Sequence, residues 1–186
     1  MAFFGLLRSS EYTSPKINAH NSTTLMFEHV VASPSTTMMF IRLQASKTDP
    51  FRKGVTIRLH RIDSPFCPVQ AAQNFIRAHP SHRGPFFQYQ DGSFLTRNRL
   101  SAILQAAFPL CTNINTHSFR IGGASIAAAH GIPDYVIQIM GRWSSDCFRQ
   151  YIRLPDANLA NYQQTMSNPS SSTIIWDADT LSSRNL

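Results

Sequence analysis

The stretch THSFRIGGASIAAAHGIPDYVIQIMGRWSSDCFRQYIR, residues 116–153, holds most of the residues on which the fold prediction depends. Its apolar spacing predicts a helix over 116–131 that ends at a glycine suited to a C-terminal cap. Pro133 then opens a second helix at a first-turn position. A short third helix follows over 145–154. This part of the chain is therefore expected to be helical throughout.

A different period occurs upstream, between residues 38 and 62. Apolar residues alternate with their neighbours in MMFIRLQAS and again in VTIRLHRI, which is typical of strands. The turn-rich sequence KTDPFRKG, residues 47–54, separates the two runs. These features predict an antiparallel β-hairpin with one face in water.

The remaining elements are mostly helices. We expect helices over 1–12, 68–79, 96–108 and 156–166, with Thr96 as an N-cap. The predicted fold is α+β, mainly α, with a small antiparallel sheet. A single domain is expected over 1–167, followed by a polar C-terminal tail, 168–186.

Composition narrows the classes of function. The chain has 186 residues and carries 17 Lys and Arg against 10 Asp and Glu, a formal net charge of +7. This excess favours a polyanionic partner, either nucleic acid or an anionic membrane surface. Three separated cysteines fit reduced thiols in an intracellular protein. Pro80 interrupts the helix that a His79–His82 metal pair would need, and no apolar run approaches the roughly 20 residues of a membrane span.

His117 and Arg120 are three residues apart, so both are expected to project from one face of the first helical turn. That turn also favours an anion, because its backbone N–H groups are unsatisfied. The small residues that follow, IGGASIAAA, allow close packing that would fix both side chains. The structural alternative is a packed core helix with a surface His and Arg.

Tyr151 lies between Arg149 and Arg153 in FRQYIR. A phenol is a poor nucleophile unless cations stabilise its oxyanion or a base removes its proton. Taken alone, a helical tyrosine near the end of a chain is more often a packing residue. Its combination with the upstream His and Arg favours a reactive role.

HSFR, GRW and YIR occur in the order and at the separations that resemble the signature of tyrosine recombinases, the phage-integrase-type enzymes. FFGLLRSSEY resembles the segment with that family's first arginine, here Arg8, whose acidic neighbour is Glu11. SKTDPFRKGVTI resembles its hairpin loop with a catalytic lysine, here Lys47. The resemblance covers about residues 3 to 155. The sequences GRWSSD and YIR most resemble those of recombinases from eukaryotic mobile elements of the DIRS and Crypton kind.

The family has a His or Trp at a sixth active-site position. Trp143 lies eight residues before Tyr151, where the family usually leaves nine, and nine residues back is Arg142. Trp143 is favoured, because an indole N–H can hydrogen-bond a phosphate oxygen while the ring packs beside the nucleophile. Arg142 remains the alternative, since it could neutralise the same phosphate.

The resemblance implies a reaction on a DNA phosphodiester. Tyr151 would attack phosphorus while Arg8 and Arg120 hold the non-bridging oxygens. His117 would accept the phenol proton, and Lys47 would protonate the leaving 5′-oxygen. The product would be a 3′-phosphotyrosyl link that another strand can reverse. No cofactor, metal or small-molecule substrate is implied.

The expected partners are double-stranded DNA and further copies of the chain in a tetrameric synapse, and the expected location is intracellular and nuclear. Only seven residues precede Arg8, so we expect a truncated catalytic domain, a fragment or a domesticated remnant. A DNA-binding module without chemistry is the second hypothesis, and an unrelated helical scaffold is the third. The apolar STIIW, residues 172–176, is predicted either to dock on a neighbouring protomer or to fold back on its own core.

Overall fold

A computed structural model describes residues 1–32, 35, 37–45, 51, 53–79, 83–153, 158–160 and 163–164. The chain divides into a compact unit, Met1–Arg153, and a second unit, Leu154–Leu186. The predicted domain boundary at 167 and the STIIW segment lie outside the described residues, so both stay predictions. All the elements discussed below belong to the first unit.

The predicted hairpin is present. β2 (Met38–Leu43) pairs antiparallel with β3 (Val55–His60), and the short β1 (Val30–Val31) adds to the other edge of β2. Met39 pairs with Leu59, and Ile41 pairs with Ile57. Met39 and Ile41 are fully buried, as expected when alternate side chains point to one face. The period-two pattern thus predicted both the hairpin and its buried face.

A core rich in aromatic side chains lies against this sheet. α2 (Pro68–Ala78) packs on β3 and begins with the predicted proline. The Phe86 ring centroid lies 5.0 Å from that of Phe27, in the 3-10 helix η1 (Phe27–His29), and 5.2 Å from that of Phe75. α3 (Arg97–Ala107) starts at the predicted N-cap, where the Thr96 hydroxyl accepts from the Arg99 backbone N–H at 3.3 Å.

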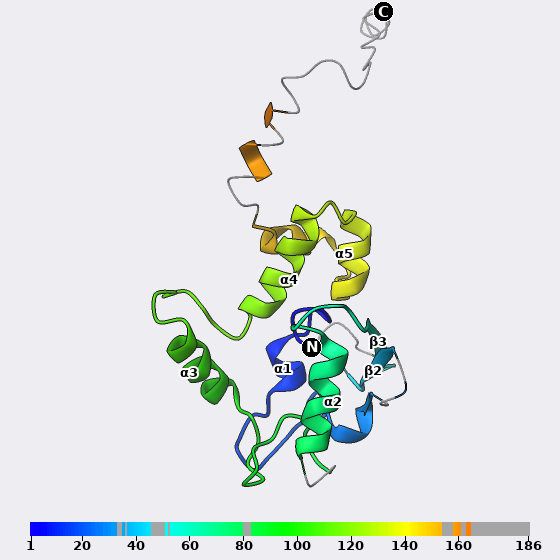
Figure 1. Ribbon diagram of the computed structural model, residues 1–186, viewed down its shortest axis with the longest axis vertical. Helices are drawn as coiled ribbons and strands as arrows, with labels where there is room; N and C mark the ends of the chain where they lie inside the picture. Colours follow the sequence, from blue (N-terminus) through cyan, green and yellow to red (C-terminus); the bar gives the residue numbers. More distant parts are fainter. Residues whose placement is uncertain are drawn as a thin grey trace, which may run out of the picture. The chain divides into compact units, whose positions relative to one another are not determined.

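A second core joins the C-terminal helices of this unit. α4 (Ser118–Ala129) packs against α5 (Asp134–Gly141), and both contact the 3-10 helix η2 (Asp146–Tyr151) (Figure 1). The buried residues of this core are Leu6, Ala124, Ala127, Ile137, Trp143 and Phe148. Leu6 comes from the start of the chain, so the N-terminal segment links α4 and α5 to the rest of the unit.

The N-terminal helix is much shorter than predicted. α1 covers only Ser9–Tyr12, and the preceding residues form turns in which Leu6 has a left-handed φ of 45°. Close packing on α4 explains this, because a Cβ on Gly123 would lie 2.5 Å from both the Leu6 Cδ2 and the Phe3 carbonyl oxygen. The prediction of helix was therefore wrong for residues 1–7.

Two smaller predictions also need correction. Pro133 is the N-cap of α5 rather than a residue of its first turn. The helix predicted over 145–154 is shorter, a 3-10 helix over Asp146–Tyr151. The predicted α+β class, mainly helical with one small antiparallel sheet, is confirmed.

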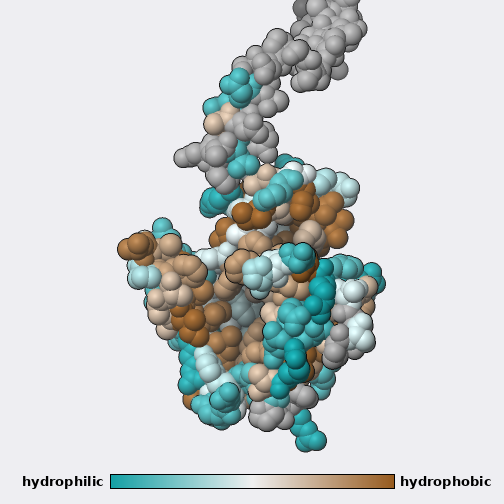
Figure 2. Space-filling view, in the orientation of Figure 1, coloured by the Kyte–Doolittle hydropathy of each residue, from teal (hydrophilic) through white to brown (hydrophobic). Residues whose placement is uncertain are grey.

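The surface of the unit is mixed. Figure 2 shows apolar surface over α5 and α3 beside polar surface over α2. The exposed apolar residues of α5 include Ile139, 71% exposed, and Tyr135, 65% exposed. Within the described residues, no helix has the length and apolar character needed to cross a membrane.

Candidate active site

The structure brings five of the six predicted site residues into one region, from four separate segments. Arg8 is the N-cap of α1, His117 is the N-cap of α4, and Arg120 lies in the first turn of α4. Trp143 follows the end of α5, and Tyr151 ends η2. Lys47, in the loop between β2 and β3, lies outside the described residues, and its role stays a prediction.

Arg120 is the most enclosed of these side chains, at 1% exposure. Its guanidinium donates to the carbonyl oxygen of Leu6, and through Nη2 to that of Gly141 at 2.6 Å. Among the described residues it has no carboxylate partner. Burial, followed by the charges of Arg8 and Arg142, lowers the pKa of Arg120 to about 9, so the group remains charged at neutral pH.

This burial corrects the expectation that His117 and Arg120 project from one face of the first helical turn. His117 precedes the helix and is partly exposed, whereas Arg120 points into the second core. Arg120, Arg8 and Arg142 share the charge of one nearby carboxylate, Glu11, so the cluster keeps a net positive charge that favours an anion. The burial of Arg120 therefore favours an anion site.

Aromatic contacts surround Tyr151. The Trp143 ring stacks on the Tyr151 ring, with centroids 5.9 Å apart and planes inclined by 29°. Trp143 also contacts Arg120, whose guanidinium carbon lies 4.0 Å from its ring centroid. The His117 ring meets Tyr151 edge-on, with centroids 5.1 Å apart. A cation, an indole, a phenol and an imidazole are therefore in consecutive contact.

The polar ends of these rings are not satisfied by the protein. In the part of the chain that the structure describes, no acceptor or donor pairs with the Tyr151 hydroxyl, the Trp143 indole N–H or the His117 ring nitrogens. None of these atoms is among the buried unpaired ones, so each reaches the surface of the protein. These three groups are thus available to a ligand bound beside Arg120.

The surroundings of His117 favour the neutral form of its ring. Burial lowers the pKa of its imidazole, and the positive charges of Arg120, Arg97 and Arg8 lower it further. A lowered pKa keeps the ring neutral at pH 7, and only the neutral ring can accept a proton.

Arg142 has a different position from the one expected of a phosphate ligand. It caps α5 in the left-handed conformation, with φ of 59°. Its Nη2 lies 3.0 Å from Glu11 Oε2, and Nη1 donates to the Gly5 carbonyl oxygen at 3.0 Å. Glu11 is 1% exposed and also pairs with Arg8, at 3.1 Å. Of the two candidates for the sixth position, Trp143 is the one in contact with the Tyr151 ring.

Sequence reasoning missed three residues that organise the site. The Tyr12 hydroxyl donates to the Thr116 carbonyl oxygen at 2.9 Å and so ties α1 to the residue before His117. The Ser125 hydroxyl donates to the Tyr151 carbonyl oxygen at 3.0 Å and accepts from the Arg153 N–H at 2.9 Å. A single polar residue among the small residues IGGASIAAA, 121–129, is a usable signal for Ser125, whereas nothing in the local sequence singles out Tyr12.

The third missed residue is Arg97, in the first turn of α3. Its Nε donates to the Thr116 hydroxyl at 3.2 Å, which brings another positive charge close to His117. Among the described residues, no group of three His, Cys, Asp or Glu side chains could hold a metal ion. The site is thus a cluster of arginines around a tyrosine, an arrangement that can hold an anion and stabilise charge developing on it.

Comparison with known proteins gives a fold but no sequence match. No protein-family model and no curated protein matches the sequence. The XerH site-specific recombinase, in a post-cleavage complex with palindromic difH substrate, has a TM-score of 0.61 over 90% of this chain at 14% identity. The XerA recombinase has a TM-score of 0.58 over 90% of this chain at 15% identity. The Tn1549 transposon integrase in complex with circular intermediate DNA has a TM-score of 0.52 over 88% at 14% identity.

These similarities confirm the predicted fold, which matches that of a tyrosine recombinase catalytic domain. The chain covers 44% of the XerH structure, 55% of XerA and 54% of the integrase. It therefore spans about half the length of the proteins it resembles. At such low identity the likeness establishes the fold alone.

Proposed function

We propose that this chain is the catalytic domain of an enzyme that breaks and rejoins DNA strands, a tyrosine recombinase, with Tyr151 as the nucleophile. The buried guanidinium of Arg120 is the observation that carries this proposal. It has backbone carbonyls but no carboxylate as acceptors among the described residues, and its charge contacts Trp143, which in turn contacts Tyr151. A phosphodiester would supply the missing negative charge.

In the proposed step the Tyr151 phenol oxygen attacks phosphorus, and the bond from phosphorus to the 5′-oxygen breaks. The phenol proton passes to His117, whose neutral ring lies in contact with the nucleophile. Lys47 gives a proton to the leaving 5′-oxygen. The phosphate remains esterified to Tyr151, so attack by a 5′-hydroxyl of another strand reverses the step.

The arginines stabilise the transition state. Negative charge grows on the two non-bridging oxygens as Tyr151 attacks, and Arg8 and Arg120 are the donors that face it. Trp143 donates its indole N–H to one of these oxygens. Loss of one such donor typically costs about 10² to 10³ in rate. Glu11 holds Arg8 in place through the 3.1 Å ion pair.

Two narrower proposals follow from the sequence resemblance. The sequences GRWSSD and YIR support the proposal that the chain is a recombinase of a mobile element of the DIRS or Crypton kind. Exchange of two duplexes involves four strand cleavages, which supports self-association on DNA as a tetramer.

The experiment is incubation of the whole chain with duplex DNA that contains a nick near the cleavage position. Loss of the short fragment beyond the nick traps any covalent protein–DNA adduct, which denaturing electrophoresis detects. We expect an adduct with the wild type and with Tyr135→Phe, an exposed tyrosine of α5. Tyr151→Phe should form none while it still binds DNA. DNA binding without an adduct in the wild type would instead support a DNA-binding remnant.

A further inference from the structure

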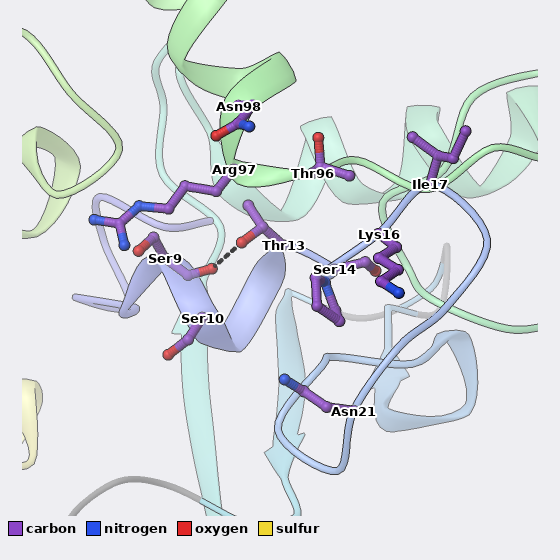
Figure 3. Close-up of a pocket in the computed structure, with 11 residues that line it drawn as sticks. Ser9, Ser10, Thr13, Ser14, Lys16, Ile17, Asn21, Thr96, Arg97 and Asn98 are labelled. Carbon is purple, nitrogen blue, oxygen red and sulfur yellow. Dashed lines mark hydrogen bonds between the residues drawn. The ribbon is translucent and has the colours of Figure 1, made fainter.

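A groove of about 520 Å³ has mostly polar residues in its walls (Figure 3). One wall is formed by α1 and the segment that follows it, and the other by the start of α3. Two basic residues, Lys16 and Arg97, line it, and both are exposed. Hydroxyl-bearing residues, including Ser10 and Ser14, make up much of the remaining wall. Among the described residues that line the groove, none is acidic. This combination of cations and hydroxyls suits a phosphate group.

The groove adjoins the candidate active site. Ser9, directly after Arg8, lines one side of it. Arg97 lines the other side, and in Figure 3 its side chain extends from α3 toward the start of α1. The 3.2 Å hydrogen bond from Arg97 to the hydroxyl of buried Thr116 holds it next to His117. An anion in the groove would therefore lie beside the phosphate at which Tyr151 reacts.

Two further features point to a ligand. Ser14 lines the groove and is 3% exposed, yet its hydroxyl has no hydrogen-bond partner among the described residues. Buried hydroxyls are rarely left unpaired. The groove also receives the N-terminus of the 11-residue helix α3, where the first backbone N–H groups have no acceptor within the helix.

We propose that this groove binds a second backbone phosphate of the DNA strand, next to the phosphate that is cleaved. The inference rests on the proposed function, since it takes its ligand from the same DNA. Arg97 and Lys16 provide the charge, and Ser14 provides a neutral hydrogen bond. The groove contacts only the backbone and thus fixes the register of the strand without reading bases.

The test measures binding of a fluorescent duplex by anisotropy over a salt series, with the whole chain carrying Tyr151→Phe so that no chemistry interferes. Lys16→Gln and Arg97→Gln should each lower the slope of log affinity against log salt by about 0.9, the effect of one lost phosphate contact. Ser14→Ala should weaken binding several-fold without changing the slope. Its melting temperature should not fall, because the lost hydroxyl has no partner in the free protein.

Arg77→Gln is the matched control, because it removes one charge from the exposed end of α2, outside the groove. It should leave the slope unchanged. Phosphate binding in the groove would be refuted if Lys16→Gln, Arg97→Gln and the control had equal slopes, or if Ser14→Ala bound DNA as well as its parent. Either result would leave the recombinase proposal intact. A parent protein that binds no duplex even at low salt would remove both proposals. Competition by free inorganic phosphate at millimolar levels would show that the groove takes the isolated ion, and would contradict a site built for the strand.

Discussion

The imidazole ring of His117 lies edge-on to the phenol ring of Tyr151, with centroids 5.1 Å apart and planes inclined by 70°. The two residues are separated by 34 positions in the sequence, and the packing of η2 on α4 brings them together. The Ser125 hydroxyl holds this approach by donating to the Tyr151 carbonyl oxygen and accepting from the Arg153 N–H. An imidazole and a phenol are thus kept in contact by the packing of η2 on α4.

The pH dependence of the reaction follows from this pair. Because burial and the charges of Arg120, Arg97 and Arg8 lower the pKa of His117, its neutral form persists below the ordinary value of 6.5. The rate of adduct formation should therefore decline on the acid side only below that pH. Arg97→Gln removes one of these charges, so it should raise the pKa and move the decline to higher pH.

The measurement is the single-turnover rate at saturating DNA over about pH 5 to 8. Arg77→Gln, whose charge does not act on His117, should leave the profile unchanged. A shift toward lower pH in Arg97→Gln would contradict the electrostatic account.

Removal of one partner from the buried ion pair of Arg142 and Glu11 should destabilise the fold far more than removal of one partner from an exposed pair. Arg142→Ala removes one of the two positive charges paired with the buried Glu11 carboxylate and leaves the Gly5 carbonyl oxygen without this hydrogen bond. It should therefore destabilise the fold by about 3 to 5 kcal/mol. Arg149→Ala breaks a pair with Asp134 in which the side chains are 61% and 53% exposed, and should cost at most about 1 kcal/mol. Urea denaturation of both variants tests this, and similar midpoints would refute it.

Adjacent glycines of α4 should respond in opposite ways to alanine. A Cβ at position 123 would meet Leu6 and the Phe3 carbonyl oxygen at 2.5 Å, so Gly123→Ala should destabilise by about 1 to 3 kcal/mol. A Cβ at position 122 would lie 3.6 Å from Phe3 Cε2, an ordinary contact. Gly122→Ala should therefore be neutral, or stabilising by up to about 1 kcal/mol. Thermal unfolding compares the two, and a stable Gly123→Ala variant would contradict the packing.

Trp143 should serve both packing and chemistry. Trp143→Ala removes the ring between Arg120 and Tyr151 and should cost about 3 to 5 kcal/mol together with the reaction rate. Trp143→Phe keeps an aromatic ring but loses the indole N–H. It should retain most of the stability yet react slowly at saturating DNA. A normal rate in Trp143→Phe would mean that the indole N–H does not contact the phosphate.

Local patterns predicted the elements well where the structure depends on local rules. Alternation predicted β2 and β3, and Thr96 marked the start of α3, because strand burial and N-capping act within a few residues. The ordered motifs also named His117 and Trp143, whose rings contact Tyr151 in the structure.

The features that depend on long-range packing could not be predicted from those local patterns. In the turn at residues 1–7, which packs closely on α4, the carbonyl groups of Leu6 and Gly5 accept hydrogen bonds from Arg120 and Arg142, more than 100 residues away in the sequence. The burial of Arg120 depends on the same contacts. No periodicity in the N-terminal segment encodes such partners, so a helix was the wrong prediction there.

Mapping the covalent link between protein and DNA is the decisive experiment for Tyr151 as the residue that becomes attached to DNA. The trapped adduct is digested with protease and nuclease, and mass spectrometry locates the residual nucleotide. We expect a nucleotide on the peptide that contains Tyr151, joined through the DNA 3′-phosphate, with a free 5′-hydroxyl on the released strand. A link on Tyr135 or Tyr162, or one through a 5′-phosphate, would contradict it.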